Sequence, residues 1–166
     1  TKEHWTAELM IGVCDNIRDD VQAFGRELIT QYFDNGAGQE YLSKLSQHPS
    51  VNVQLFTTNY LTHYAGGALD KIQELAPYFV TVFSQVNKGR VAKVRVITFL
   101  REQALASAEI AKIVANIFTR QSVTLVLRDH TQYLLAMRDI QFKYPFIELP
   151  IKKRAVPSRL ATVQGL

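Results

Sequence analysis

Cysteine is nearly absent from this sequence of 166 residues, since Cys14 is the only one. A single cysteine excludes an intrachain disulfide and a zinc site built from several cysteines. It also favours a reducing compartment, so we expect a cytoplasmic protein in which Cys14 is a small apolar core residue. Long apolar runs are missing too. None could cross a bilayer and none resembles a signal peptide, so we expect no membrane contact.

Motifs that mark known chemistry are also missing. The histidines (His4, His48, His63 and His130) are scattered, and no pair has the i, i+4 spacing with a glutamate that marks a metalloprotease. Residues 36–38 (GAG) lack the third glycine and the preceding strand of a dinucleotide site, and no phosphate loop or nucleophile elbow occurs. The sequence therefore predicts no cofactor and no metal, and an enzyme with a site in a groove is the least supported hypothesis.

What is present fits one globular domain. The hydrophobic fraction is 47% and the charged fraction 20%, and 166 residues can bury a sizeable core. Residues 1–87 carry five Lys and Arg against ten Asp and Glu, whereas residues 88–166 carry fourteen against five. The net charges of −5 and +9 fit a solvated dipolar domain, and they also fit binding to an acidic partner or nucleic acid.

Apolar spacing predicts helices over most of the chain. Two stretches place large apolar residues at i, i+3, i+7, i+8 and i+11, which puts five side chains on one helix face. Helical periodicity covers residues 21–32, 53–64, 68–87, 90–105, 110–118 and 130–144. Pro77 removes a backbone donor inside its segment, so we expect a kink or a division into two helices there. We assign residues 1–145 to one helical domain.

Local signals predict where some helices begin and end. Ser107 is expected to cap the helix that follows it, Asp129 to cap the helix at 130–144, and Pro145 to close that helix. Residues 122–127 (SVTLVL) are rich in β-branched residues, but one strand has nothing to pair with, so we expect a buried connector or helix start. Residues 146–166 are expected to form an extended basic tail, packed by Phe146 and Ile147.

Parts of the sequence repeat. Val21-Gln22 precedes Phe24 and Val53-Gln54 precedes Phe56 with the same spacing, and Val94-Arg95 precedes Ile97 in a third segment. The three segments are 32 and 41 residues apart. Similarity at this period indicates stacked helical pairs, because one pair cannot bury its apolar face alone. A helical bundle without repeats, containing two similar helices, is the alternative.

Over residues 15–120 the chain resembles the HEAT-repeat family. HEAT repeats pair two antiparallel helices, with an Asp in the turn and a Val-Arg pair that opens the second helix. Val94-Arg95 matches that pair and Asp15 matches the turn, whereas His48 and Gly89 stand at the comparable turn positions of the other units. Pro77 lies in a first helix but four residues from the usual place. The resemblance implies an all-α superhelix of about eight helices in antiparallel pairs.

Basic residues supply the candidate binding site. Arg90, Lys93 and Arg101 fall within about 80° of one another on a helical wheel. In a stack of helices, equivalent positions of successive helices line one surface. The predicted stripe consists of Lys88, Arg90, Lys93, Arg101, Arg128 and Arg138. Such a stripe suits phosphates, or an acidic surface such as the N-terminal half of a second copy.

Two functions remain open at this point. HEAT-like proteins mostly act as scaffolds that bind other proteins, so the first hypothesis is a non-enzymatic module that binds a partner protein. The second is a nucleic-acid-binding module that uses the basic C-terminal half. Because the first residue is Thr1 and not methionine, the chain is also a candidate for part of a larger protein.

Overall fold

A computed structural model describes residues 4–85, 90–123 and 126–150. These residues form helices and connecting loops with no strand among them, which confirms the predicted all-α class. The α-helices are α1 (Ala7–Cys14), α2 (Asp19–Tyr32), α3 (Gly38–Leu45), α4 (Val51–Thr57), α5 (Leu61–Ala65), α6 (Leu69–Glu74), α7 (Ala76–Ser84), α8 (Arg90–Ala106), α9 (Ala108–Gln121) and α10 (Leu127–Lys143). Two 3-10 turns, η2 (Asn35–Ala37) and η3 (Thr58–Tyr60), complete the described elements.

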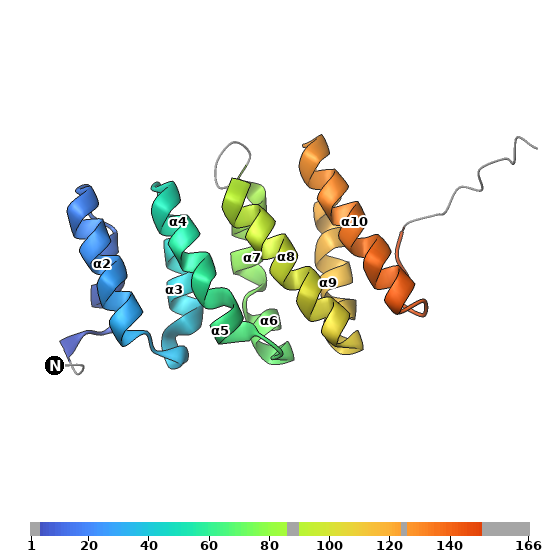
Figure 1. Ribbon diagram of the computed structural model, residues 1–166, viewed down its shortest axis with the longest axis horizontal. Helices are drawn as coiled ribbons and strands as arrows, with labels where there is room; N and C mark the ends of the chain where they lie inside the picture. The colour runs from blue at the N-terminus through green and yellow to red at the C-terminus, as the bar shows by residue number, and fades with distance from the viewer. Residues whose placement is uncertain (1–3, 86–89, 124–125, 151–166) are drawn as a thin grey trace, which may run out of the picture.

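The helices lie in two layers. Figure 1 shows α2, α4 with α5, α8 and α10 side by side in the front layer, with α3, α7 and α9 behind them. Contacts join α2 to α4, α4 and α5 to α8, and α8 to α10 within the front layer. Helices that are consecutive in sequence, such as α1 and α2 or α8 and α9, pack across the two layers. Each front-layer helix is therefore covered from behind by its neighbours in the chain.

Several predicted boundaries are confirmed. Ser107 caps α9, because its side chain accepts a hydrogen bond from the backbone N–H of Ile110. Pro77 divides its segment as expected: α6 ends at Glu74, and α7 follows with Pro77 in its first turn. The helix α10 ends at Lys143, two residues before Pro145.

Other predicted boundaries are wrong. Asp129 does not cap a helix: α10 begins earlier, at Leu127, and its N-cap residue Val126 makes no side-chain capping bond. For residues 122–127 the expected burial is wrong at Val123, which is 83% exposed, but the alternative of a helix start is confirmed, because α10 begins at Leu127. Residues 124–125 lie outside the described part of the chain. At the other end of α10, Ile147 packs into the core as predicted, whereas Phe146 is 64% exposed.

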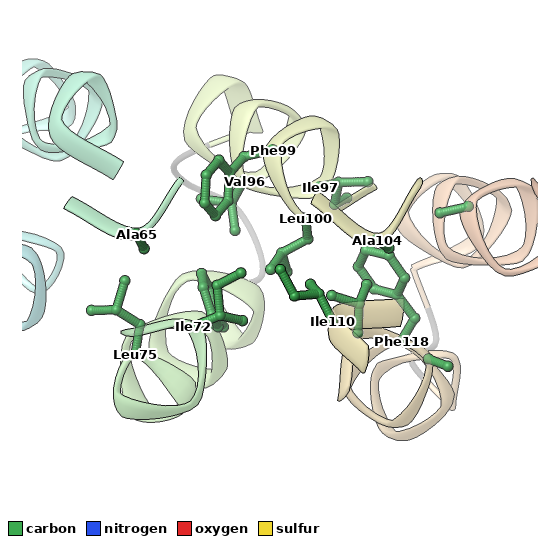
Figure 2. Close-up of a cluster of buried hydrophobic side chains, with 14 of the residues drawn as sticks. Ala65, Ile72, Leu75, Val96, Ile97, Phe99, Leu100, Ala104, Ile110 and Phe118 are labelled. Carbon is green, nitrogen blue, oxygen red and sulfur yellow. The ribbon is translucent and has the colours of Figure 1, made fainter. Parts of the chain in front are cut away.

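Buried apolar side chains form two clusters. The larger core combines residues of α5 to α10 with Leu42 of α3 and Ile147 from the segment after α10. Figure 2 shows Val96, Leu100 and other α8 side chains packed between α5, α6 and α9. The smaller core joins α1, α2, α3 and α4 around Met10, Cys14 and Ile29. Cys14 is fully buried there, as predicted. Burial of these faces supplies most of the favourable free energy of folding.

The two similar segments carry the same buried hydrogen bond. Gln22 donates its side-chain Nε2–H to the carbonyl oxygen of Asn16, and Gln54 donates in the same way to His48, both at 2.6 Å. In both cases the acceptor lies six residues before the glutamine, in the loop that leads into the helix. Each glutamine therefore ties its helix to the preceding turn. Phe24, predicted on the buried face of its helix, is instead 48% exposed.

Candidate functional site

The predicted basic residues lie in different environments. Arg90 is the first residue of α8 and Arg128 the second residue of α10, and both side chains are exposed. Lys88 lies outside the described residues. Arg101 and Arg138 are about half exposed and both contact one carboxylate, that of Asp139. The surface therefore offers separate arginines near the two ends of α8 and α10.

Lys93 is an interior residue. Its side chain is 6% exposed, and its ammonium group lies 2.8 Å from the carboxylate of Asp129, which is 17% exposed. Asp129 is thus the partner of a buried lysine, and this explains why it does not cap α10. In this arrangement Lys93 joins α8 to α10, and its charge is neutralised within the protein.

Two ion pairs fix the orientation of α8 against α10. Lys93 near the start of α8 pairs with Asp129 near the start of α10, and Arg101 further along α8 pairs with Asp139 further along α10. The two helices are therefore parallel neighbours within one layer. Arg138 also contacts Asp139, at 2.9 Å, so two guanidinium groups share this carboxylate. Two of the basic residues that the sequence suggests for a ligand, Lys93 and Arg101, are therefore used between helices.

A groove that the sequence did not indicate lies between α7 and α9. Its volume is about 210 Å³. Ala76 and Val80 from α7, and Ile113 and Ile117 from α9, provide apolar surface, and Val80 is 54% exposed. The polar lining consists of Gln73, Asn116, Arg120 and Gln121. The groove therefore combines an aliphatic surface with three amide side chains and one guanidinium group.

A second groove flanks α9 on its other side. It has a volume of about 450 Å³ and lies between α9 and the segment that follows α10. Its lining comprises Lys112, Ala115, Asn116 and Thr119 from α9, with Phe146, Ile147, Glu148 and Pro150 from the segment. Asn116 lines both grooves, so the outer side of α9 separates two adjoining depressions. We call this region the α9 surface.

A third depression, lined by His48 and Asp15 among others, lies beside the smaller core. His48 is buried, and its Nδ1 accepts a hydrogen bond of 2.9 Å from the backbone N–H of Ser50, the N-cap residue of α4. The Nε2 atom lies 3.6 Å from the carboxylate of Asp15. His48 therefore makes a local hydrogen bond, to a residue two positions further along the chain. The His48 ring holds the start of α4, whereas the side chain of His63 is exposed.

Cys14 and Glu74 are two further titratable groups, and both have structural surroundings. Burial raises the pKa of the Cys14 thiol to about 11, so the group stays protonated at neutral pH and is a poor nucleophile. Hydrogen bonds from Lys71 and Tyr64 lower the pKa of Glu74 and hold it charged. Among the described residues, no three His, Cys, Asp or Glu side chains are placed to hold a metal ion.

Two further observations bear on function. No helix in the described part of the chain combines the length and apolar character needed to span a bilayer. No protein-family model, curated protein or solved structure matches the chain.

Proposed function

We propose that the protein is a non-enzymatic, HEAT-like scaffold module that binds a partner protein through the α9 surface. Three features support a HEAT-like superhelix: the two layers of helices, the parallel front-layer neighbours α8 and α10, and the glutamine bond repeated at Gln22 and Gln54. A cytoplasmic location remains a prediction from the single cysteine. The observation that carries the proposed binding role is the composition of the groove between α7 and α9.

The groove lining suits an extended peptide. A peptide backbone presents N–H donors and C=O acceptors in alternation, and each asparagine or glutamine side chain carries both kinds of group. Asn116 and Gln121 from α9, and Gln73 from α6, supply such amides beside the aliphatic surface of Val80 and Ile117. Apolar side chains of the peptide would cover that surface, and Arg120 would attract a carboxylate.

Nucleic-acid binding has weaker support. Tight binding to phosphates needs several cations that are free to neutralise them. Lys93 is buried against Asp129, and Arg101 and Arg138 share the single charge of Asp139, so only one of these three positive charges has no carboxylate of its own. The predicted stripe of basic residues along α8 and α10 is therefore interrupted. Arg90 and Arg128, near the starts of these two helices, are the exposed arginines of the stripe that have no such contact within the described part of the chain.

Selection from a displayed library of random peptides tests the proposal. Enriched sequences, made as synthetic peptides, would be titrated into the wild-type protein and the Asn116→Ala/Val80→Asp variant. We expect saturable binding that weakens by about tenfold or more in the variant, because it loses an amide contact and gains a charge on the apolar surface. The matched control, Asn52→Ala on the exposed side of α4, should bind like wild type. Failure to enrich any peptide that depends on the groove would overturn the proposal.

The nucleic-acid alternative requires its own variant. Lys93→Glu would bring a carboxylate against Asp129 and disturb the fold, so it cannot report on binding. Arg90→Glu/Arg128→Glu changes two exposed charges instead. Fluorescence anisotropy with labelled duplex DNA, single-stranded DNA and RNA would be recorded at several salt concentrations. Saturable binding that falls steeply with salt and is lost in this variant would favour the alternative function.

A further inference from the structure

The two ends of the helical stack differ in charge but share exposed apolar residues. Figure 1 places α2 at one end and α10 at the other. Over residues 7–32, which include α1 and α2, five acidic side chains face two basic ones. On α10 both aspartates pair with residues of α8. Arg128 is exposed, Arg138 is about half exposed and shares Asp139 with Arg101, and the exposed Lys143 donates to the carbonyl oxygen of Leu105. The exposed charge is therefore acidic at the α2 end and basic at the α10 end.

Exposed apolar side chains accompany the arginines of α10. Leu127 is 77% exposed, Leu134 36% and Leu135 39%. Leu127 and Leu134 are seven residues apart, so they share one side of the helix. Arg128 lies next to Leu127, and Arg138 lies one turn beyond Leu134. Along α10 the exposed order is thus Leu127, Arg128, the pair Leu134 and Leu135, and Arg138.

The α2 end carries a matching order. Phe24 of α2 is 48% exposed and lies edge-on to Trp5, with 6.3 Å between the ring centroids. Asp20 precedes Phe24 by about one turn and Glu27 follows it by about one turn, and both carboxylates are exposed. Asp20 also pairs with Arg18, in an exposed contact of 2.6 Å. Along α2 the exposed order is aspartate, phenylalanine, glutamate.

Neighbouring helices of the front layer run in the same direction. Tyr60 donates to Thr30 and so links η3 to α2, and Arg95 donates to Asn59 and so links α8 to η3. In each case the partners lie at similar distances from the start of their helical segments, as they do between α8 and α10. A helix added beside α10 in the same manner would therefore be parallel to it.

From these matching orders we infer that the α10 end of one copy docks on the α1–α2 end of a second copy. Placed as the next front-layer helix, α2 of the second copy brings its exposed Asp20 and Glu27 toward the arginines of α10, and its exposed Phe24 toward the leucines of α10. The contact joins unlike surfaces, so copies assemble head to tail. Residues 151–166 are a poorer occupant, because their charges are all basic and α10 already presents arginines. This interface is separate from the α9 surface.

Sedimentation velocity over a range of protein concentrations tests the inference. We expect the average mass of wild type to rise above that of one chain, and the association constant to fall by about tenfold or more between low and high salt. The Arg128→Glu/Arg138→Glu variant and the Asp20→Lys/Glu27→Lys variant should each remain monomeric. A mixture of the two should associate, because each reversed end then meets a complementary one.

Three results would overturn the inference: a wild-type protein that stays monomeric at every concentration, association that persists in both variants, or a mixture that stays monomeric. Leu127→Asp, at a residue 77% exposed, provides a second probe that leaves the ion pairs of α10 intact. It should also remain monomeric. Far-UV circular dichroism and thermal melting would verify that each variant is folded.

Discussion

The smaller core at α1 to α4 and the larger core at α5 to α10 are held by different polar contacts. Around the smaller core, Gln22 and Gln54 each bond to a backbone carbonyl in the loop before their own helix. Beside the larger core, Lys93 and Arg101 pair with aspartates of another helix, more than thirty residues away. The glutamine hydrogen bonds fix a turn locally, whereas the ion pairs fix one helix against its neighbour.

This difference has a consequence for how each region responds to change. A neutral hydrogen bond to a carbonyl depends little on salt, and its loss affects one turn. A buried ion pair depends on both partners being present, since either charge alone is costly in the interior. In the third repeated segment, Val94-Arg95, an arginine takes the place of Gln22 and Gln54. Arg95 donates to Thr58 and Asn59 of η3, and so links α8 to the turn that follows α4.

The largest effect is expected from Phe118→Ala in the larger core. Phe118 is fully buried, and its ring packs against Phe83 and Tyr133. We expect the free energy of unfolding to fall by about 3–5 kcal/mol, from lost burial and the cavity left behind. Urea unfolding followed by circular dichroism measures it. Phe146→Ala, at a residue 64% exposed, is the control and should change stability by less than about 1 kcal/mol. Equal effects would contradict the core assignment.

The next effect comes from breaking the buried ion pair. Lys93→Met leaves the carboxylate of Asp129 mostly buried without its partner, so we expect a loss of about 3 kcal/mol. The double variant Lys93→Met/Asp129→Leu should recover most of the loss, since no lone charge remains. Arg138→Met is the control, because Asp139 keeps Arg101. If the double variant is as unstable as Lys93→Met, the loss comes from altered packing and not from the unpaired charge of Asp129.

Around the smaller core, Gln22→Ala and Gln54→Ala should each have an intermediate effect. Each substitution removes a hydrogen bond of 2.6 Å, partly buried at Gln22 and buried at Gln54, and leaves a carbonyl oxygen without its donor. We expect losses of about 1–2 kcal/mol in urea unfolding, with little dependence on salt. Gln31→Ala, on an exposed part of α2, should be neutral. If Gln31→Ala costs as much, helix propensity and not the repeated bond is responsible.

The smallest effects concern one tyrosine in each core. The hydroxyls of Tyr41 and Tyr78 are buried and lack a hydrogen-bond partner among the described residues. Tyr41→Phe and Tyr78→Phe should therefore leave stability unchanged or raise it by up to about 1 kcal/mol. Tyr64→Phe, which loses a bond to Glu74, is the contrasting variant and should lower stability. A clear loss in both of the first two variants would contradict the assignment of unpaired hydroxyls.

The same tyrosines predict a pH dependence. Burial raises the pKa of Tyr41 to about 12 and also raises that of Tyr78. The folded state therefore holds the phenolic proton more tightly than the unfolded state, whose tyrosines titrate near 10. The contribution of these two protonated phenols to the free energy of unfolding is therefore fully present below pH 10, and it is lost as the pH rises toward 12. Unfolding free energies measured from pH 8 to 11 should fall less steeply in the Phe variants.

Short-range features of the fold could be predicted because their causes are local. Ser107 has the residue type and place of an N-cap, and proline interrupts a helix wherever it occurs, as at Pro77. Cys14 is buried as expected for a small apolar residue. Which side chains of α2 are buried was predicted less well. Phe24 has helical spacing with buried residues, but it lies at the end of the stack, where no further helix of the chain covers it in the described part.

The candidate site could not be predicted in the same way. A lysine in a helix normally lies at the surface, and only the position of Asp129, 36 residues further along, explains why Lys93 is buried. The α9 surface depends on α7 lying beside α9, and no local pattern of Val80 or Asn116 indicates that neighbour. The lining of a groove is set by which helices are adjacent, and adjacency depends on contacts between distant segments.

By itself, then, the sequence determined the all-helical class, the interruption at Pro77 and the unequal charge of the two halves, because spacing, ring geometry and residue type act locally. The tertiary structure decided which charges are paired and which remain exposed. It also gave Gly25 its role: Cys14 packs so closely against α2 that a Cβ at this position would lie 2.7 Å from the sulfur. Such close approaches require two helices to be in place, because they depend on distances that no single segment contains.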